Sequence, residues 1–156
     1  MVVISDTSPL NYLVLIGEIS LLPRLFGRVL VPGEVMEELK RAAPSGPVSQ
    51  WLASQPDWLI TADVRFTRLP SLDLGETAAI ALAKQFPGEA LLVVDDLLGR
   101  RAARAAGVEA TGTIGVLQQA AARGWIDLPD AIRRLQSTNF RISRALLEQV
   151  LRPPAS

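Results

Sequence analysis

The stretch Leu91-Leu92-Val93-Val94-Asp95-Asp96 is the clearest structural signal in the chain, because four apolar residues end abruptly in two acids. A short run without alternation is typical of a strand buried on both faces of a parallel sheet. Similar runs lie at 2–4, 28–31, 58–61 and 108–111. Helical patterns separate them at 10–16, 21–26, 48–54, 74–86, 97–106 and 113–123, continue at 129–137 and 143–151, and include one helix opened by Pro32 before a loop at 43–47. We therefore predict a three-layer α/β/α fold around a parallel sheet of about five strands.

Length and composition narrow the classes of function. The 156 residues predict a single domain over 1–156, with an ordinary globular content of apolar and charged residues. The chain has no cysteine and no histidine, which excludes disulfides, thiolate or imidazole metal ligands and catalytic triads built on histidine. Sixteen basic residues balance sixteen acidic ones, so no overall field draws the chain towards nucleic acid or membrane. No apolar run approaches the ~20 residues of a membrane span, and the start carries no charged leader, so we expect a cytoplasmic protein.

Acidic residues follow or precede the predicted strands at several points. Asp6 follows the first strand, Glu38 lies in the helix after the second, and Asp73 opens the helix before the fourth. In an open parallel sheet such residues can meet at the carboxyl ends of the strands, where ligands bind. Gathered carboxylates repel one another, and a divalent cation reverses that cost. Oxygen ligands alone favour Mg²⁺ or Mn²⁺, which can support phosphodiester hydrolysis.

Each acid also has a structural interpretation. Asp6 could cap the following helix, although Ser8, followed by Pro9 at the first helical position, is better placed for that role. Glu38 has other glutamates around it on the same helix, and by itself it would be a solvated surface residue.

The later acids can serve as helix caps as well. Asp73-Leu74-Gly75-Glu76 has the spacing of a capping box, and from spacing alone this structural role is favoured over catalysis. One member of the Asp95-Asp96 pair could cap the next helix, but two adjacent carboxylates at the end of a strand exceed what capping needs. Singly these signals are weak, and the functional interpretation depends on the whole set.

Several motifs, taken together and in order, resemble a PIN domain. They are Asp6-Thr7-Ser8-Pro9-Leu10, Val31-Pro32 with Glu38-Leu39, Leu72-Asp73-Leu74-Gly75-Glu76, Val94-Asp95-Asp96 with Gly99-Arg100-Arg101, and the stretch Gly112 to Leu117. The resemblance is to the PIN-like subfamily with an Asp-Thr-Ser-Pro-Leu start and a late Gly-Thr-x-Gly-Val-Leu stretch. It covers nearly the whole chain and implies a Mg²⁺- or Mn²⁺-dependent ribonuclease, often the toxin half of a toxin–antitoxin pair.

The resemblance also assigns roles to individual acids. The four acids of the family match Asp6, Glu38, Glu76 and Asp96, which are expected to be catalytic. The expected metal ligands are these four together with Asp95. Glutamate stands at position 76, where the family usually has aspartate.

Hydroxyl and basic residues beside these acids are candidates for contact with substrate: Ser8, Arg100, Arg101 and Thr113. Ser8 and Thr113 are also suited to capping, and the helix that Thr113 opens could receive a phosphate at its N-terminus. Arg100 and Arg101, with Arg104, could bind RNA phosphates or form an exposed helix face. Arg141 and Arg144 are weaker candidates.

Two hypotheses follow for function. The first is an endoribonuclease acting on single-stranded RNA, and the second is a catalytically silent PIN-like module that binds RNA or protein. A phosphoacceptor receiver domain is disfavoured. Its paired acids follow the first strand, whereas the pair in this chain follows the fourth. The resemblance further implies a homodimer and a small antitoxin that covers the acids. The apolar stretches 10–16 and 21–26 could form such a surface or belong to the core.

Overall fold

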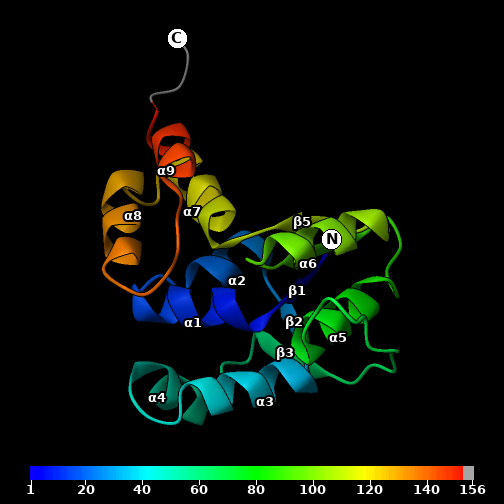
Figure 1. Cartoon of the computed structure of the whole chain (residues 1–156). Coiled ribbons are helices and arrows are strands. Elements are labelled where there is room, and N and C mark those ends of the chain that lie inside the picture. Colours follow the sequence, from blue (N-terminus) through cyan, green and yellow to red (C-terminus); the bar gives the residue numbers. More distant parts are fainter. Residues whose placement is uncertain (153–156) are drawn as a thin grey trace.

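The computed structural model describes residues 1–152, which are built around a parallel sheet of five strands in the order β3-β2-β1-β4-β5 (Figure 1). The strands are β1 (Val2–Ser5), β2 (Val29–Pro32), β3 (Leu59–Ala62), β4 (Ala90–Val93) and β5 (Glu109–Thr111). All the pairings are parallel, and β1 lies against β4 from Val2 opposite Ala90 to Ser5 opposite Val93. The strand order reverses between β1 and β4, the position at which open sheets of this kind bind ligands. The predicted α/β class and parallel sheet are confirmed.

Helices cover both faces of this sheet. They are α1 (Thr7–Leu15), α2 (Leu21–Phe26), α3 (Gly33–Ala42), α4 (Pro47–Ala53), α5 (Leu74–Ala83), α6 (Leu97–Ala105), α7 (Thr113–Ala122), α8 (Leu128–Gln136) and α9 (Arg144–Leu151). Val3 and Val93 pack into the larger apolar cluster, with α1, α2 and α7. Ile4 and Leu92 pack into the smaller one, with α5 and α6. Neighbouring strand residues therefore face opposite layers, which explains why the strands are apolar throughout.

The first helix begins earlier than the sequence predicted. Asp6, rather than Ser8, occupies the N-cap position, and Pro9 lies in the first turn of α1. Proline is tolerated there because the first amides of a helix have no partner within it. The expectation that Ser8 caps this helix is wrong, and Ser8 is free to use its hydroxyl elsewhere.

The other boundaries agree with those predicted or differ by up to three residues, and α2 lies at 21–26 as predicted. The strand predicted at 91–94 is β4 at 90–93, and the helix predicted at 74–86 ends at Ala83. Beyond Ala83 the backbone tightens, because the amides of Gln85 and Phe86 bond to carbonyls three residues back rather than four.

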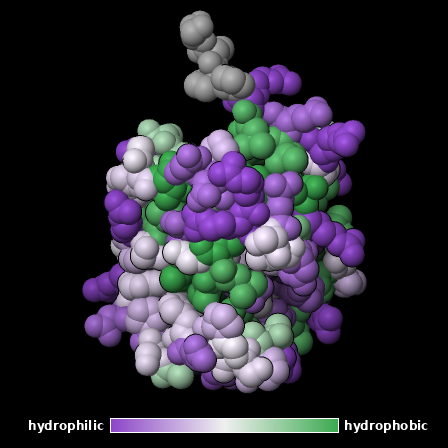
Figure 2. All heavy atoms as spheres, turned by 90° about the vertical axis from the view of Figure 1, so that its left-hand side faces the viewer, coloured by the Kyte–Doolittle hydropathy of each residue, from purple (hydrophilic) through white to green (hydrophobic). Residues whose placement is uncertain are grey.

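The apolar stretches of α1 and α2 belong mainly to the core. Leu10, Leu13, Leu21 and Leu22 are completely buried, whereas Leu15 is exposed. On the face that lies on the left of Figure 1, hydrophobic side chains form separate areas with a hydrophilic area between them (Figure 2). Among residues 1–152, no helix combines the length and the hydropathy that crossing a membrane requires.

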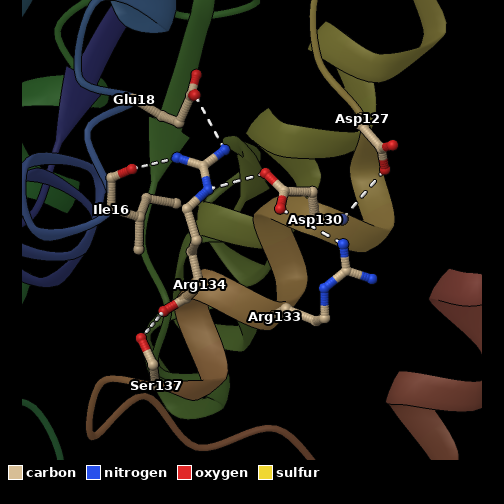
Figure 3. A network of polar contacts seen from close by, with 7 residues as sticks. All are labelled: Ile16, Glu18, Asp127, Asp130, Arg133, Arg134 and Ser137. Carbon is tan, nitrogen blue, oxygen red and sulfur yellow. Dashed lines mark hydrogen bonds and ion pairs between the residues drawn. The ribbon is translucent and has the colours of Figure 1, made fainter.

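Arg134 ties α8 to the end of α1 (Figure 3). Its guanidinium donates to the carbonyl of Ile16, to Glu18 at 3.1 Å and to Asp130 at 3.1 Å. The neighbouring Arg133 reaches only Asp130, at 3.4 Å, and its side chain is exposed. Hydrogen bonds from a charged donor to several partners fix a helix better than one exposed ion pair does. This contact holds α8, and with it the adjoining α7, against the rest of the fold.

Candidate metal centre

A cavity of about 580 Å³ opens at the carboxyl ends of β1, β2 and β4. Its lining brings together residues from distant parts of the sequence: Asp6, Thr7, Ser8, Asn11, Tyr12, Glu38, Ala42, Asp73, Glu76, Asp95 and Asp96. Every acid that the sequence singled out therefore lies in one cavity. A larger cavity of about 660 Å³ lies between residues 65–69 and α5, but no carboxylate lines it.

Three of these acids converge on one another. One carboxylate oxygen from each of Asp6, Glu38 and Asp73 lies within 4.8 Å of the other two. Asp6 follows β1, Glu38 comes from the second turn of α3, and Asp73 is the N-cap of α5. Oxygen donors from three separate elements could thus reach a single hard cation such as Mg²⁺ or Mn²⁺.

Asp6 is the most deeply buried of the three. Its side chain is 5% exposed, and its Oδ1 has no hydrogen-bond partner. Although it stands at the N-cap of α1, its carboxylate does not cap that helix. The pKa of Asp6 is raised to about 7, chiefly by burial; the amide of Thr7 lowers it, and the charges of Asp73, Glu38 and Asp95 contribute to the rise. A bound cation would oppose this shift, because it favours the charged carboxylate.

Two donors hold the Glu38 carboxylate in place. The hydroxyl of Thr7 donates to Oε2 and the amide of Gly75 donates to Oε1, both at 2.8 Å. The amide of Gly75 is in the first turn of α5, where it lacks a partner within the helix. The close approach needs a glycine, because a Cβ on residue 75 would lie only 2.5 Å from Oε2 of Glu38.

Asp73 and Glu76 form the capping box that the spacing predicted. The amide of Glu76 donates to Asp73 Oδ1 at 2.7 Å, and the amide of Asp73 donates to Glu76 Oε1 at 3.2 Å. The other oxygen of Glu76, Oε2, is buried and has no partner. Burial first, and then the neighbouring Asp96 carboxyl, raise the pKa of Glu76 well above its usual range. A proton on Glu76 would allow it to donate to Asp96, since two ionised carboxylates have no hydrogen to share.

The two adjacent acids after β4 have different partners. Asp95 accepts three hydrogen bonds, from the amide of Thr113 at 2.7 Å, the hydroxyl of Thr113 at 2.8 Å and the hydroxyl of Ser8 at 2.8 Å. Asp96 caps α6 by accepting from the amide of Gly99 at 3.2 Å. Asp95 therefore joins α1 to α7, whereas Asp96 caps the start of α6.

The residues expected to contact substrate also differ in their surroundings. Thr113 is completely buried and uses both its amide and its hydroxyl on Asp95, so the predicted phosphate site at the start of α7 is replaced by this internal contact. Arg100 donates to the backbone carbonyls of Val94 and Asp95. Arg101 is exposed. Arg104 reaches the carbonyl of Ala110 at 3.4 Å and does not line the acid cavity.

The three tryptophans pack against the core and do not line the acid cavity. Trp51, Trp58 and Trp125 are partly buried against the larger apolar cluster. Trp51 and Trp58 lie 6.0 Å apart between ring centroids, and the guanidinium of Arg24 lies 4.1 Å from the ring centroid of Trp125.

A family model, DUF3368, described as a PIN domain, matches residues 2–154. The chain belongs to the PIN-domain family. No curated protein and no solved structure gave a match. PIN domains are generally nucleases and typically use divalent metal ions, and the acid cavity of this PIN domain is compatible with both properties.

One acid in the cavity of this PIN domain, Asp73, is not among the metal ligands that the resemblance predicted. Asp73 was assigned to the capping box, and it does cap α5, yet it also lies beside Asp6 and Glu38. Glu76, which matches the third acid of the family, lines the same cavity but does not belong to this group of three. The sequence did place Asp73 among the acids that could meet at the carboxyl ends of the strands, but the family resemblance gave the third acid position to Glu76. A carboxylate has two oxygens, so one oxygen of Asp73 can cap α5 while the other binds a cation.

Proposed function

We propose that this PIN domain is a metal-dependent endoribonuclease that hydrolyses phosphodiester bonds of single-stranded RNA. The observation that supports this most strongly is the convergence of Asp6, Glu38 and Asp73, of which Asp6 has a buried oxygen, Oδ1, with no partner among residues 1–152. Three anionic side chains placed together without a compensating charge cost stability, and a divalent cation removes that cost. The arrangement is better suited to holding a cation than to stabilising the fold.

The donor set fits Mg²⁺ or Mn²⁺, because all the candidate ligands are carboxylate oxygens and the chain has neither histidine nor cysteine. We assign Asp6, Glu38 and Asp73 as the residues that hold the ion. When bound, such an ion activates water and stabilises the leaving oxygen in phosphodiester hydrolysis. Because no side-chain base is required for this chemistry, a chain without histidine can perform it.

The remaining acids of the proposed catalytic set support this centre. Asp95 and Asp96 border the cavity, and Glu76 lines it and accepts the amide of Asp73. Thr7 and Gly75 orient Glu38, whereas Ser8 and Thr113 orient Asp95. We assign substrate phosphates to Arg100 and Arg101, at the start of α6 beside the acids.

The biological setting follows from the resemblance alone. We propose that the protein is the toxin of a toxin–antitoxin pair in the cytoplasm, that it forms a homodimer, and that a small antitoxin covers the acid cavity. We also propose that residues 1–156 form one PIN-like domain, of which residues 153–156 lie outside the described part of the structure.

The deciding experiment is cleavage of mixed-sequence single-stranded RNA by the purified protein in Mg²⁺, in Mn²⁺ and in EDTA, with Asp6→Asn as the matched variant. We expect cleavage that needs the ion and falls at least about 1,000-fold in the variant, which corresponds to about 4 kcal/mol of barrier. Asp6→Asn should fold normally without metal, because it removes a buried charge that has no partner.

The alternative is a catalytically silent module that binds RNA or protein. One observation favours it: Glu76, at the family's third acid position, folds back onto the backbone of Asp73 and has a strongly raised pKa. Absence of cleavage with either ion, at high protein concentration and with antitoxin shown to be absent, would overturn the nuclease proposal in favour of this module.

A further inference from the structure

A side cavity of about 250 Å³ adjoins the acid cavity, and Asp95 lines both of them. Side chains from three parts of the chain line the side cavity. Arg100 comes from α6, Gln118 from α7, and Phe140 and Arg141 from the segment between α8 and α9. The side cavity therefore continues the acid cavity towards a basic and aromatic surface.

The wall that separates the two cavities is fixed by α1. Tyr12 lines the acid cavity, and its ring meets the ring of Phe140 edge to face, with 4.9 Å between centroids. The hydroxyl of Tyr12 donates to Oδ1 of Asn139 at 2.8 Å. Phe140, on the side-cavity side of this contact, is thus held at the border of the acid centre. A fixed aromatic ring beside a reactive centre is suited to positioning a flat ligand group.

The chemistry of the side cavity differs from that of the acid cavity. Arg100 and Arg141 supply positive charge, and Arg141 is exposed. The amide of Gln118, which is also exposed, can both donate and accept a hydrogen bond. Apart from Asp95, no acid lines this cavity. Cations, an amide and an aromatic ring match the phosphate, base edge and base face of an unpaired nucleotide.

We propose that the side cavity binds the nucleotide next to the scissile phosphodiester, with its base beside Phe140, its edge read by Gln118 and its phosphate contacted by Arg141. This inference rests on the proposed function, because it takes the acid centre as the place of cleavage. It assigns to this chain a determinant of sequence preference outside the acid cluster.

The test uses three variants of the full chain: Gln118→Ala, Arg141→Ala and Phe140→Leu. Leucine keeps apolar volume against Tyr12 but removes the aromatic face. Gln119→Ala is the matched control, because Gln119 is the exposed neighbour of Gln118 on α7 and does not line the cavity. Affinity is measured in EDTA by fluorescence anisotropy with a short labelled single-stranded RNA of mixed sequence. Cleavage sites are mapped in Mg²⁺ by sequencing the products, and thermal melting checks the fold of each variant.

Each variant has its own expected result. Phe140→Leu should weaken RNA binding by about 5- to 150-fold, the range for loss of one stacked base. Arg141→Ala should weaken binding for all sequences alike and reduce the slope of log affinity against log salt by about 0.7. Gln118→Ala should relax the base preference at one position beside the cleaved bond, whereas Gln119→Ala should leave the preference unchanged.

The failure of this inference is distinguishable from the failure of the proposed function. If the wild type cuts RNA and all three variants bind and cut as it does, the side cavity is not a nucleotide site and the nuclease proposal stands. If the wild type binds RNA without cutting it, the same losses of affinity support the side cavity while the nuclease proposal fails. If the wild type neither binds nor cuts RNA, both proposals are wrong. Should Phe140→Leu fail to fold, Gln118→Ala and Arg141→Ala decide the question, since both residues are exposed.

Discussion

The acid cavity contains two groups of carboxyl groups that differ in how closely their oxygens approach one another. Asp6, Glu38 and Asp73 converge within 4.8 Å, and no cationic side chain among residues 1–152 lines the cavity that they share. In the second group, Asp95 has three hydrogen-bond donors and Asp96 caps α6. Both groups accept hydrogen bonds, since Thr7 and Gly75 donate to Glu38 and the amide of Glu76 donates to Asp73, but only in the first group do three carboxylates converge. An acid that lines the cavity is therefore not by that fact alone a candidate ligand.

Glu76 belongs with the second group. Its Oε1 accepts the Asp73 amide, and its raised pKa favours a neutral carboxyl beside Asp96. Glu76 also lies outside the group of three carboxylates that converge within 4.8 Å, so we do not expect it to hold the ion. The difference between the groups can therefore be tested by exchanging one acid from each for its amide.

The largest expected effect separates Asp73→Asn from Glu76→Gln. Asparagine still caps α5 but removes a charge from the metal group, so cleavage should fall by more than the ~10–100-fold typical of residues that only support a ligand. Glutamine imitates a protonated Glu76, so Glu76→Gln should change cleavage by about threefold or less, under 1 kcal/mol of barrier. Cleavage rates and Mn²⁺ titration calorimetry measure both variants.

The opposite result would reverse the assignment of the third ligand. If Glu76→Gln abolished Mn²⁺ binding while Asp73→Asn retained it, Glu76 would be the ligand that the family resemblance implies, and Asp73 would be only a cap.

The next effect concerns stability in the absence of metal. The pKa of Asp6 is about 7 in the fold against an ordinary value of 3.8, so the folded state binds more protons between these values. The contribution of Asp6 to the free energy of unfolding without metal should therefore be most favourable below about pH 4. It should become less favourable as the pH rises through 7. The shift of about three units corresponds to at most about 4 kcal/mol, and we expect on the order of 2 kcal/mol.

Urea unfolding in EDTA at several pH values measures this dependence, and Asp6→Asn is the control. The variant should lose the part of the pH dependence that belongs to Asp6 and should exceed the wild type in stability above pH 7. Identical pH profiles for the two proteins would mean that the Asp6 carboxylate is compensated in the fold.

The smallest expected effect comes from Gly75→Ala, with Gly33→Ala as the matched control near the start of another helix. A Cβ on residue 75 would lie 2.5 Å from Glu38 Oε2, whereas one on residue 33 would lie 3.8 Å from Asp63 Oδ1. Because Glu38 is flexible, Gly75→Ala should move its carboxylate without unfolding the protein, and alanine adds up to ~1 kcal/mol of helix stability. We expect cleavage to fall about tenfold in Gly75→Ala and to stay unchanged in Gly33→Ala. Equal activities would show that the position of Glu38 is unimportant.

The fold was predictable because its signals are local. The strand around Leu92 is apolar at every position, since Leu91 and Leu92 face opposite layers of helices. Element ends were less predictable, because Pro9 fits the first turn of a helix at more than one position. The spacing of Asp73 and Glu76 also predicted their capping box correctly, since it depends on one turn of chain.

The site was only partly predictable. The residue types alone limited the possible metal chemistry to carboxylates and a hard cation such as Mg²⁺ or Mn²⁺, because a chain without histidine or cysteine offers few other ligands. Which carboxylates face one another was decided by the tertiary structure. The chain leaves β1 for β2 and β3 and returns to β4 on the other side of β1, which brings the start of α5 beside Asp6 and Glu38. Local sequence dictates hydrogen bonds within a turn, whereas the distance between charges many residues apart depends on how the packed elements meet.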